Sequence, residues 1–318
     1  MKLNTQVAKF FEDIEKGMQQ FNRPSQNEIS PQEARLFFNK SREFTGESNY
    51  NIKNIEVEHK YISGREHEIP IRIYTPKGSG PFPVMVFFHA GGWVLGDLDC
   101  CDALCQFISK FSKCIVVSVG YRLAPEYKYP KPLEDAVDAV KWVIHNINEI
   151  NGDISRIAIG GESSGGNLAA VTAQIMRDSG LYSFHSQFLI CPVINYNFDT
   201  SSYNECGTQY ELTKEKMQWF WSNYLEEESQ GLEPYASPLL AKDFSHLPPA
   251  IIATAEFDPL REEGKYYANR LKDYGVPVKH ICFSGLVHSF AHMFIKVELA
   301  KEALEELTTE LYNLLHPK

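Results

Sequence analysis

The sequence contains no long hydrophobic run and no basic tract. Its apolar stretches, such as Val84–Phe88, are as long as strands and fall far short of the roughly 18 apolar residues that a membrane-spanning helix needs. Acidic residues outnumber basic ones by 41 to 31, so the formal net charge is −10, which is not the charge of a typical nucleic-acid-binding protein. We therefore expect neither a membrane span nor a nucleic-acid partner.

The sequence shows no pattern of a secretory signal and no paired cysteine motifs, so we expect neither a secretory leader nor a cysteine-based metal site. The first residues, Met1–Val7, contain no apolar segment followed by a small-residue cleavage site. The seven cysteines include no CxxC pair, although Cys100, Cys101 and Cys105 are close in sequence. We interpret these three as small buried residues rather than metal ligands, because they have no partner pair elsewhere. Reduced thiols are typical of the cytoplasm, which is the expected location of the protein.

The composition is that of a folded protein. Of the 318 residues, 43% are hydrophobic and 23% are charged, which excludes disorder as the main state of the chain. This length suits one large domain or two small ones with a substantial core.

The sequence of residues 1–50 predicts two amphipathic helices. Apolar side chains recur at spacings of three and four between Val7 and Phe21, which gives the first helix one apolar stripe. The second helix is expected to start at Ser30, because Ser30 and Glu33 form a capping-box pattern around a proline at the first helical position. Helices that precede any strand need a surface to cover, so we expect residues 1–50 to belong to a cap.

From Ile52 onward, the pattern changes to strands that alternate with helices. The first two predicted strands, a hairpin, are Ile52–Val57 and Ile69–Tyr74. Apolar runs follow at Val84–Phe88, Ile115–Val119, Ile157–Ile159, Phe188–Cys191, Ile251–Ala255 and Val278–Phe283, with helical segments at Leu133–His145, Gly166–Arg177 and Gly264–Tyr274. This alternation predicts an α/β fold with a mostly parallel sheet, helices on both of its faces and one antiparallel edge.

One stretch interrupts this alternation. Between residues 195 and 235, aromatic side chains accompany a single predicted helix, Lys214–Leu225, and no strand pattern occurs. We interpret residues 195–235 as a cap insertion that meets the N-terminal helices above the sheet. Residues 51–194 and 236–318 would then form the two parts of one α/β core.

The strongest candidate for chemistry is Ser163, which lies in the GxSxG motif Gly161-Glu162-Ser163-Ser164-Gly165. A short predicted strand precedes this motif and a predicted helix follows it, as in a nucleophile elbow. In such an elbow a tight turn exposes a strained serine, and the helix N-terminus places a positive dipole beneath the reacting oxygen. The alternative is a glycine-rich turn with an incidental serine.

A nucleophilic serine needs a base, and the base needs an acid to orient it. His288 is the best candidate base, because it lies in a loop between the last predicted strand and the last helix. Asp258 is the best candidate acid, since it follows a strand and the proline after it favours a loop that reaches a histidine. His292 and Glu256 are the nearest rivals. The order serine, aspartate, histidine is that of α/β-hydrolases, and such sites assemble at the C-terminal ends of parallel strands.

Small residues follow the strand Val84–Phe88, in the sequence His89-Ala90-Gly91-Gly92-Trp93. Backbone N–H groups in such a loop are free to converge on a negatively charged oxygen. His89 ends a strand well before the serine, so we interpret it as a residue that braces this loop rather than as the base.

Together these motifs resemble the hormone-sensitive-lipase-like (bacterial family IV) carboxylesterases of the α/β-hydrolase superfamily. The resemblance runs from the N-terminal helices to about His292, and further includes Tyr121–Glu126, Ser237–Leu239 and Leu247–Pro249. It implies Ser163 as nucleophile, Asp258 as acid and His288 as base. The oxyanion-hole donors that it implies are the backbone N–H groups of Gly91, Gly92 and Ser164. It also implies a helical cap, neither a cofactor nor a metal ion, and a possible homodimer.

The chain departs from the usual family pattern at four positions. Ala90 replaces the first glycine of the HGGG motif, and Glu162 and Ser164 replace the more common aspartate and alanine beside the nucleophile. Ser289 stands where a glycine usually follows the histidine, which restricts the loop. None of these changes removes a catalytic group.

The activity that the resemblance implies is that of a serine carboxylesterase acting on small-molecule esters with short-to-medium acyl chains. Candidates for lining the substrate pocket are Trp93, Tyr196 and Trp219, with packing inside the cap as the alternative role. An amidase or deacetylase with the same triad stays open, because the triad is indifferent to the leaving group. The remaining alternative is a non-catalytic small-molecule receptor on the same fold.

Overall fold

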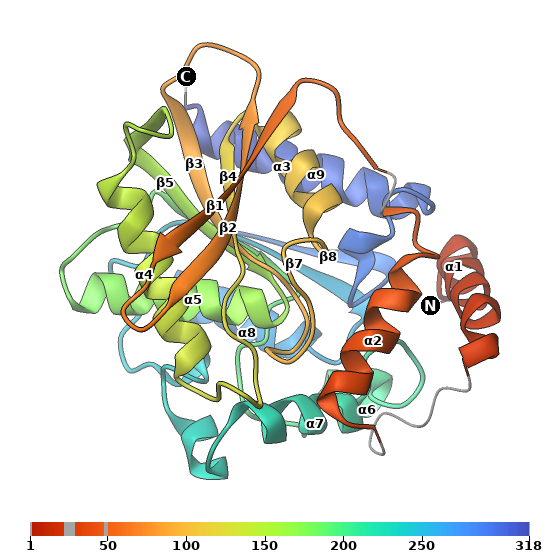
Figure 1. The fold of residues 1–318 in the computed structure, drawn as a ribbon. Coiled ribbons are helices and arrows are strands. Elements are labelled where there is room, and N and C mark those ends of the chain that lie inside the picture. Colours follow the sequence, from red (N-terminus) through yellow and green to blue (C-terminus); the bar gives the residue numbers. More distant parts are fainter. Residues whose placement is uncertain (1, 22–28, 48–49, 318) are drawn as a thin grey trace.

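The computed structural model describes residues 2–21, 29–47 and 50–317. Within these ranges, the centre of the molecule is an eight-stranded sheet with the order β1-β2-β4-β3-β5-β6-β7-β8 (Figure 1). The strands are β1 (Ile55–Ser63), β2 (Glu68–Pro76), β3 (Phe82–Phe88), β4 (Ile115–Val119), β5 (Gly152–Glu162), β6 (Ser186–Ile190), β7 (Ala250–Phe257) and β8 (Val278–Val287).

The sheet is parallel except at one edge. Strand β1 pairs antiparallel with β2, and β2 pairs antiparallel with β4, whereas the other neighbouring strands are parallel. The central strands are buried on both faces because helices cover both of them, which explains their continuous apolar runs. The predicted mostly parallel sheet with an antiparallel edge is thereby confirmed.

The helices form one layer on each face of the sheet. Buried side chains of α1, α3 and α9 share one apolar core with one sheet face, and those of α4, α5 and α8 share the other core. The helices are α1 (Thr5–Met18), α2 (Pro31–Arg42), α3 (Asp102–Ser112), α4 (Lys131–His145), α5 (Ser164–Asp178), α6 (Ser201–Cys206), α7 (Lys214–Tyr224), α8 (Arg261–Asp273) and α9 (Glu298–Leu315). No helix of the described residues combines the length and the apolar character needed to cross a membrane.

Three elements differ from the sequence prediction. Strand β1 is shifted from the expected Ile52–Val57 to Ile55–Ser63, because this edge strand is mostly exposed and no buried apolar run marks its ends. Helices α3 and α6 are absent from the prediction. Most residues of α3 are buried, although polar residues recur along it at helical spacing, from Asp102 through Gln106 to Lys110. Cys100 and Cys101, just before α3, and Cys105 within it are buried free thiols, as predicted.

Two segments outside the sheet contact the loops at the C-terminal ends of its strands. From the N-terminal segment, the Arg35 side chain of α2 donates hydrogen bonds to the carbonyl oxygens of Val94 and Ala124, each at 2.8 Å. From the segment between β6 and β7, Tyr224 of α7 stacks on Trp93 with ring centroids 4.1 Å apart. Both segments therefore lie over the loops that follow β3 and β4. The division into cap and core at residues 50, 194 and 235 stays a prediction, and part of residues 1–50 lies outside the described ranges.

Candidate active site

Ser163 lies at a sharp turn between β5 and α5. Its backbone has φ +55° and ψ −118°, a region that residues with a side chain rarely adopt. The turn is tight enough to require its glycines: a Cβ atom at Gly165 would lie 2.0 Å from the carbonyl oxygen of Phe88, and one at Gly161 would lie 2.3 Å from that of Gly165. The start of α5 thus packs directly against the end of β3, which brings the serine turn beside the loop that follows β3.

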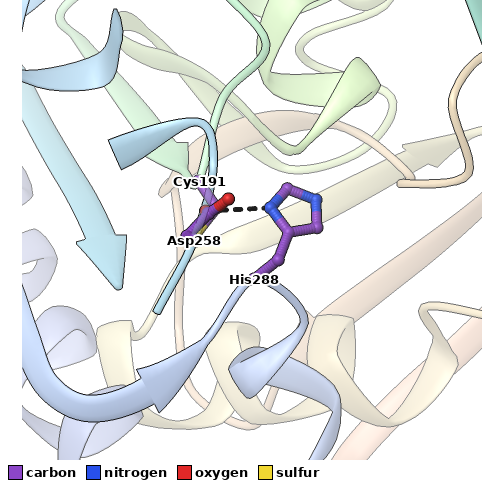
Figure 2. A group of neighbouring side chains, drawn as sticks. All are labelled: Cys191, Asp258 and His288. Atoms are coloured by element: carbon purple, nitrogen blue, oxygen red, sulfur yellow. Dashed lines mark hydrogen bonds and ion pairs between the residues drawn. The ribbon is translucent and has the colours of Figure 1, made fainter. Parts of the chain in front are cut away.

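The structure brings Ser163, His288 and Asp258 together although they are far apart in sequence. The Nε2 atom of His288 lies 2.9 Å from Ser163 Oγ, and its Nδ1 atom lies 2.9 Å from Asp258 Oδ2. Figure 2 shows the His288 imidazole pointing at the Asp258 carboxylate, with the hydrogen bond between them as a dashed line. The other carboxylate oxygen, Oδ1, accepts a hydrogen bond from the Leu260 N–H at 2.9 Å, which fixes the carboxylate after the end of β7.

The surroundings of His288 favour its protonated form. Burial alone would lower the pKa of this imidazole, but nearby carboxylates raise it above its usual value of 6.5. Among the carboxylates, Asp258 raises the pKa of His288 most, through its charge and its hydrogen bond. The charges of Glu211 and Glu162 raise this pKa further. An imidazole in this environment is well suited to accept a proton from Ser163.

Glu256 and His292, the alternative candidates for the acid and the base, have other hydrogen-bond or ion-pair partners. Glu256 accepts hydrogen bonds from Ser284 Oγ at 2.5 Å and from the Gly285 N–H at 2.8 Å, so its carboxylate braces β8. His292 lies between two carboxylates, with Nδ1 2.9 Å from Glu47 and Nε2 2.7 Å from Glu162. Neither side chain is bonded to Ser163 in the described part of the chain.

Three backbone N–H groups, one in the serine turn and two in the loop that follows β3, are the expected donors to a negatively charged oxygen. In the described ranges, the N–H groups of Gly91, Gly92 and Ser164 donate no hydrogen bond to another protein group. Gly91 and Gly92 have φ angles of +124° and +59°, and a Cβ atom at Gly91 would lie 2.1 Å from the carbonyl oxygen of Leu95. The loop therefore needs glycine to form its turn. His89 is buried below it and stacks on Tyr121, with ring centroids 4.2 Å apart, which agrees with a bracing role.

The three aromatic candidates for the pocket occupy different positions. Trp93 is fully buried against Tyr224, Tyr196 is partly buried with its ring against Trp221, and Trp219 is partly buried beside Phe220. Phe220 is closer to the glycine loop than the sequence suggests: a Cβ atom at Gly92 would lie 2.2 Å from its ring. Phe220 is therefore the aromatic side chain that covers the Gly92 backbone.

Sequence reasoning missed Phe220 as the side chain over Gly92, and it missed Cys191 and Glu211 as neighbours of His288. The helical spacing of Met217, Phe220 and Tyr224, all of them buried, is a signal that could have identified Phe220. No sequence pattern points to Cys191 or Glu211. Cys191 follows β6 at φ +42°, and Glu211 lies in the loop between α6 and α7.

One group in the described ranges has the donor atoms that a metal ion prefers. The ligand atoms of Cys191, Asp258 and His288 all lie within 4.8 Å of one another (Figure 2). The Asp258 and His288 atoms are hydrogen-bonded to each other, however, and burial together with the Asp258 and Glu162 charges raises the pKa of the Cys191 thiol. Zinc binds a thiolate, whereas these surroundings favour the protonated thiol of Cys191. The group therefore suits an acid–base pair of Asp258 and His288 better than a metal site.

Comparison with known proteins finds clear relatives. Residues 85–292 match a family described by the α/β hydrolase fold. The chain is 40% identical over 247 residues to the carboxylic ester hydrolase LipN of Mycobacterium tuberculosis, a match that covers 76% of this chain and 66% of LipN. It is 38% identical over 230 residues to an arylesterase of Saccharolobus solfataricus, covering 72% of this chain and 75% of that protein.

Solved structures show the same similarity over nearly the whole chain. The hyperthermophilic esterase of the archaeon Pyrobaculum calidifontis superposes with a TM-score of 0.90 at 36% identity, over 99% of each chain. The thermostable carboxylesterase EstE1 from a metagenomic library superposes with a TM-score of 0.87 at 38% identity, over 91% of this chain and 99% of EstE1. Both the sequence and the architecture are thus similar to those of esterases.

Proposed function

Because the chain belongs to the α/β-hydrolase fold family, within its hormone-sensitive-lipase-like group of carboxylesterases, we propose that it hydrolyses carboxylic esters by acyl transfer to Ser163. The observation that carries this proposal is the continuous hydrogen-bonded chain from Ser163 Oγ through His288 to Asp258, with 2.9 Å at each step. A nucleophile, a base and an orienting acid in this order are the groups that acyl transfer needs.

The first half of the reaction forms an acyl-enzyme. Ser163 Oγ attacks the ester carbonyl carbon while His288 Nε2 takes its proton. Asp258 holds the imidazole by its Nδ1 atom and stabilises the imidazolium that results. The tetrahedral intermediate then collapses, and its alcohol leaves with the proton that His288 returns.

The second half releases the acid. A water molecule gives a proton to His288 and attacks the acyl carbon, and Ser163 leaves with that proton. The mechanism requires no cofactor or metal ion. In both halves, the negative oxygen is stabilised by the N–H groups of Gly91, Gly92 and Ser164, at about 3 kcal/mol for a single donor.

The same arrangement supports a preference for short-to-medium acyl chains. Ser163 and His288 are only 6% and 7% exposed, and Phe220 closes the space beside Gly92. A covered site with an aromatic wall suits small-molecule esters better than long chains in an emulsion. A homodimer and a cytoplasmic location stay predictions from the sequence.

The test is hydrolysis of p-nitrophenyl esters with acyl chains of increasing length. The native protein should be most active on short chains, and Ser163→Ala should lose at least about 10⁴-fold in kcat, because the nucleophile is gone. Ser155→Ala is the matched control, since this exposed serine lies near the other end of β5 and should leave the rate unchanged. Undiminished activity on long-chain emulsions would refute the chain-length preference.

The same assay distinguishes the esterase from the two alternative functions, an amidase and a non-catalytic receptor. Comparing p-nitrophenyl acetate with p-nitroacetanilide varies only the leaving group, so faster turnover of the anilide would identify an amidase. A native protein that hydrolyses neither compound and still binds small esters would be a receptor.

A further inference from the structure

Glu211 connects the segment above the sheet to the loop that carries His288. It lies between α6 and α7, and its Oε2 atom accepts a hydrogen bond from Ser289 Oγ at 2.5 Å. The same atom accepts the Ser289 N–H at 3.3 Å. Because Ser289 directly follows His288, this carboxylate holds the backbone next to the imidazole.

The hydroxyl of Ser289 provides the shorter of these two bonds. With a glycine at this position, as the family pattern would have it, only the longer bond from the backbone N–H would remain. Hydrogen bonds to a charged acceptor are stronger than those between neutral groups, so this hydroxyl is a substantial part of the attachment. The attachment joins two segments that are 78 positions apart in the chain.

Glu211 also contributes to the charge around His288. The groups that face this imidazole are Asp258 after β7, Glu162 at the end of β5, the Cys191 thiol after β6, and Glu211. Glu162 is paired with His292 at 2.7 Å, and Asp258 is bonded to His288 itself. Glu211 is the member of this group that comes from the loop between α6 and α7.

We propose that Glu211 is a positioning residue for the reaction: it holds the His288 loop through Ser289, and its charge stabilises the imidazolium that forms during acyl transfer. The proposal rests on the esterase function proposed above. It implies that the position of the α6–α7 segment over the site is coupled to the orientation of the base. A substrate that orders this segment would therefore also order His288.

The test is the pH dependence of kcat/KM for p-nitrophenyl acetate in Glu211→Gln. The glutamine oxygen still accepts the Ser289 hydrogen bonds, so this variant removes the charge and keeps the attachment. The acid limb of the profile reports the ionisation of the base in the free enzyme. Because a negative charge favours imidazolium, its removal should move that limb to lower pH by about half a unit and lower the plateau about fivefold.

Ser289→Gly separates the attachment from the charge. It should lower the plateau of kcat/KM and move the acid limb less than Glu211→Gln does, because the carboxylate is still present. If Glu211→Gln does not fold, a reduced kcat at unchanged KM in Ser289→Gly supports the proposal, and native kcat contradicts it. Glu205→Gln is the control, since Glu205 lies on α6 and pairs with Arg261 at 2.6 Å.

The outcomes distinguish this proposal from the proposed function. A native protein without ester hydrolysis would refute the function on which the proposal rests. If the native protein and Glu205→Gln hydrolyse the ester, and both Glu211→Gln and Ser289→Gly have the native pH profile and plateau, Glu211 has no positioning role while the esterase assignment stands.

Discussion

The Nε2 atom of His292 lies 2.7 Å from a carboxylate oxygen of Glu162, the residue directly before Ser163. Its Nδ1 atom lies 2.9 Å from Glu47, in the segment that follows α2. One imidazole thus joins the turn of the nucleophile to the N-terminal segment. The three side chains are largely buried, so the two carboxylates depend on this cation for their stability in the folded protein.

We expect His292→Gln to destabilise the protein by roughly 3 kcal/mol at pH 7, because it leaves buried carboxylates without their cation. Burial lowers the pKa of His292, but Glu162 and Glu47 raise it well above 6.5. The stabilisation is therefore fully present below about pH 6.5 and is lost as the pH rises through the folded-state pKa. Urea unfolding at pH 7 and pH 10 should show a smaller difference between native and variant at pH 10. Equal stability at pH 7 would contradict the role assigned to His292.

Glu263 provides a second test of buried charge. Burial raises the pKa of this carboxyl group well above 4.5, and its Oε1 atom accepts the Ile194 N–H at 2.7 Å. The folded chain keeps a proton that the unfolded chain releases, so this group lowers the stability of the fold as the pH rises from 4.5 through the folded-state pKa. Glu263→Gln, an uncharged isostere, should match the native stability at pH 5 and exceed it at pH 8. The control is the exposed Glu302→Gln on α9, and equal pH dependence of all three proteins would contradict the prediction.

Phe220 should limit the acyl chains that the site accepts. Phe220→Ala removes the ring that lies against Gly92, so the ratio of kcat/KM for p-nitrophenyl octanoate to that for the acetate should rise about tenfold. Trp219→Ala removes a neighbouring aromatic ring from the same helix and is expected to change this ratio less. A larger effect at Trp219 would favour the pocket lining predicted from the sequence.

Much of the fold could be predicted because its signals are local. The apolar runs of the central strands, the capping box at Ser30 and the strand–turn–helix around Ser163 each depend on neighbouring residues. Strand β1 is misplaced because it is mostly exposed, so no buried apolar run marks its ends. Helix α3 has polar residues at helical spacing, a local signal that the prediction does not use.

The parts of the site that escaped prediction depend on contacts between distant segments. Glu47 and His292 are 245 positions apart, and Glu211 and Ser289 are 78 positions apart. A single charged residue in a loop carries no local sign of such a partner. Phe220 and Trp219 are equally aromatic, and only the packing of α7 decides which of them faces Gly92.

The most direct test of the proposed mechanism is the mass of the intact protein after reaction with a p-nitrophenyl alkylphosphonate. Attack of Ser163 Oγ on phosphorus expels p-nitrophenolate and leaves a stable adduct. We predict one adduct per chain, on the peptide that contains Ser163, and no adduct in Ser163→Ala. An unmodified native protein, or equal labelling of the variant, would contradict a nucleophilic Ser163.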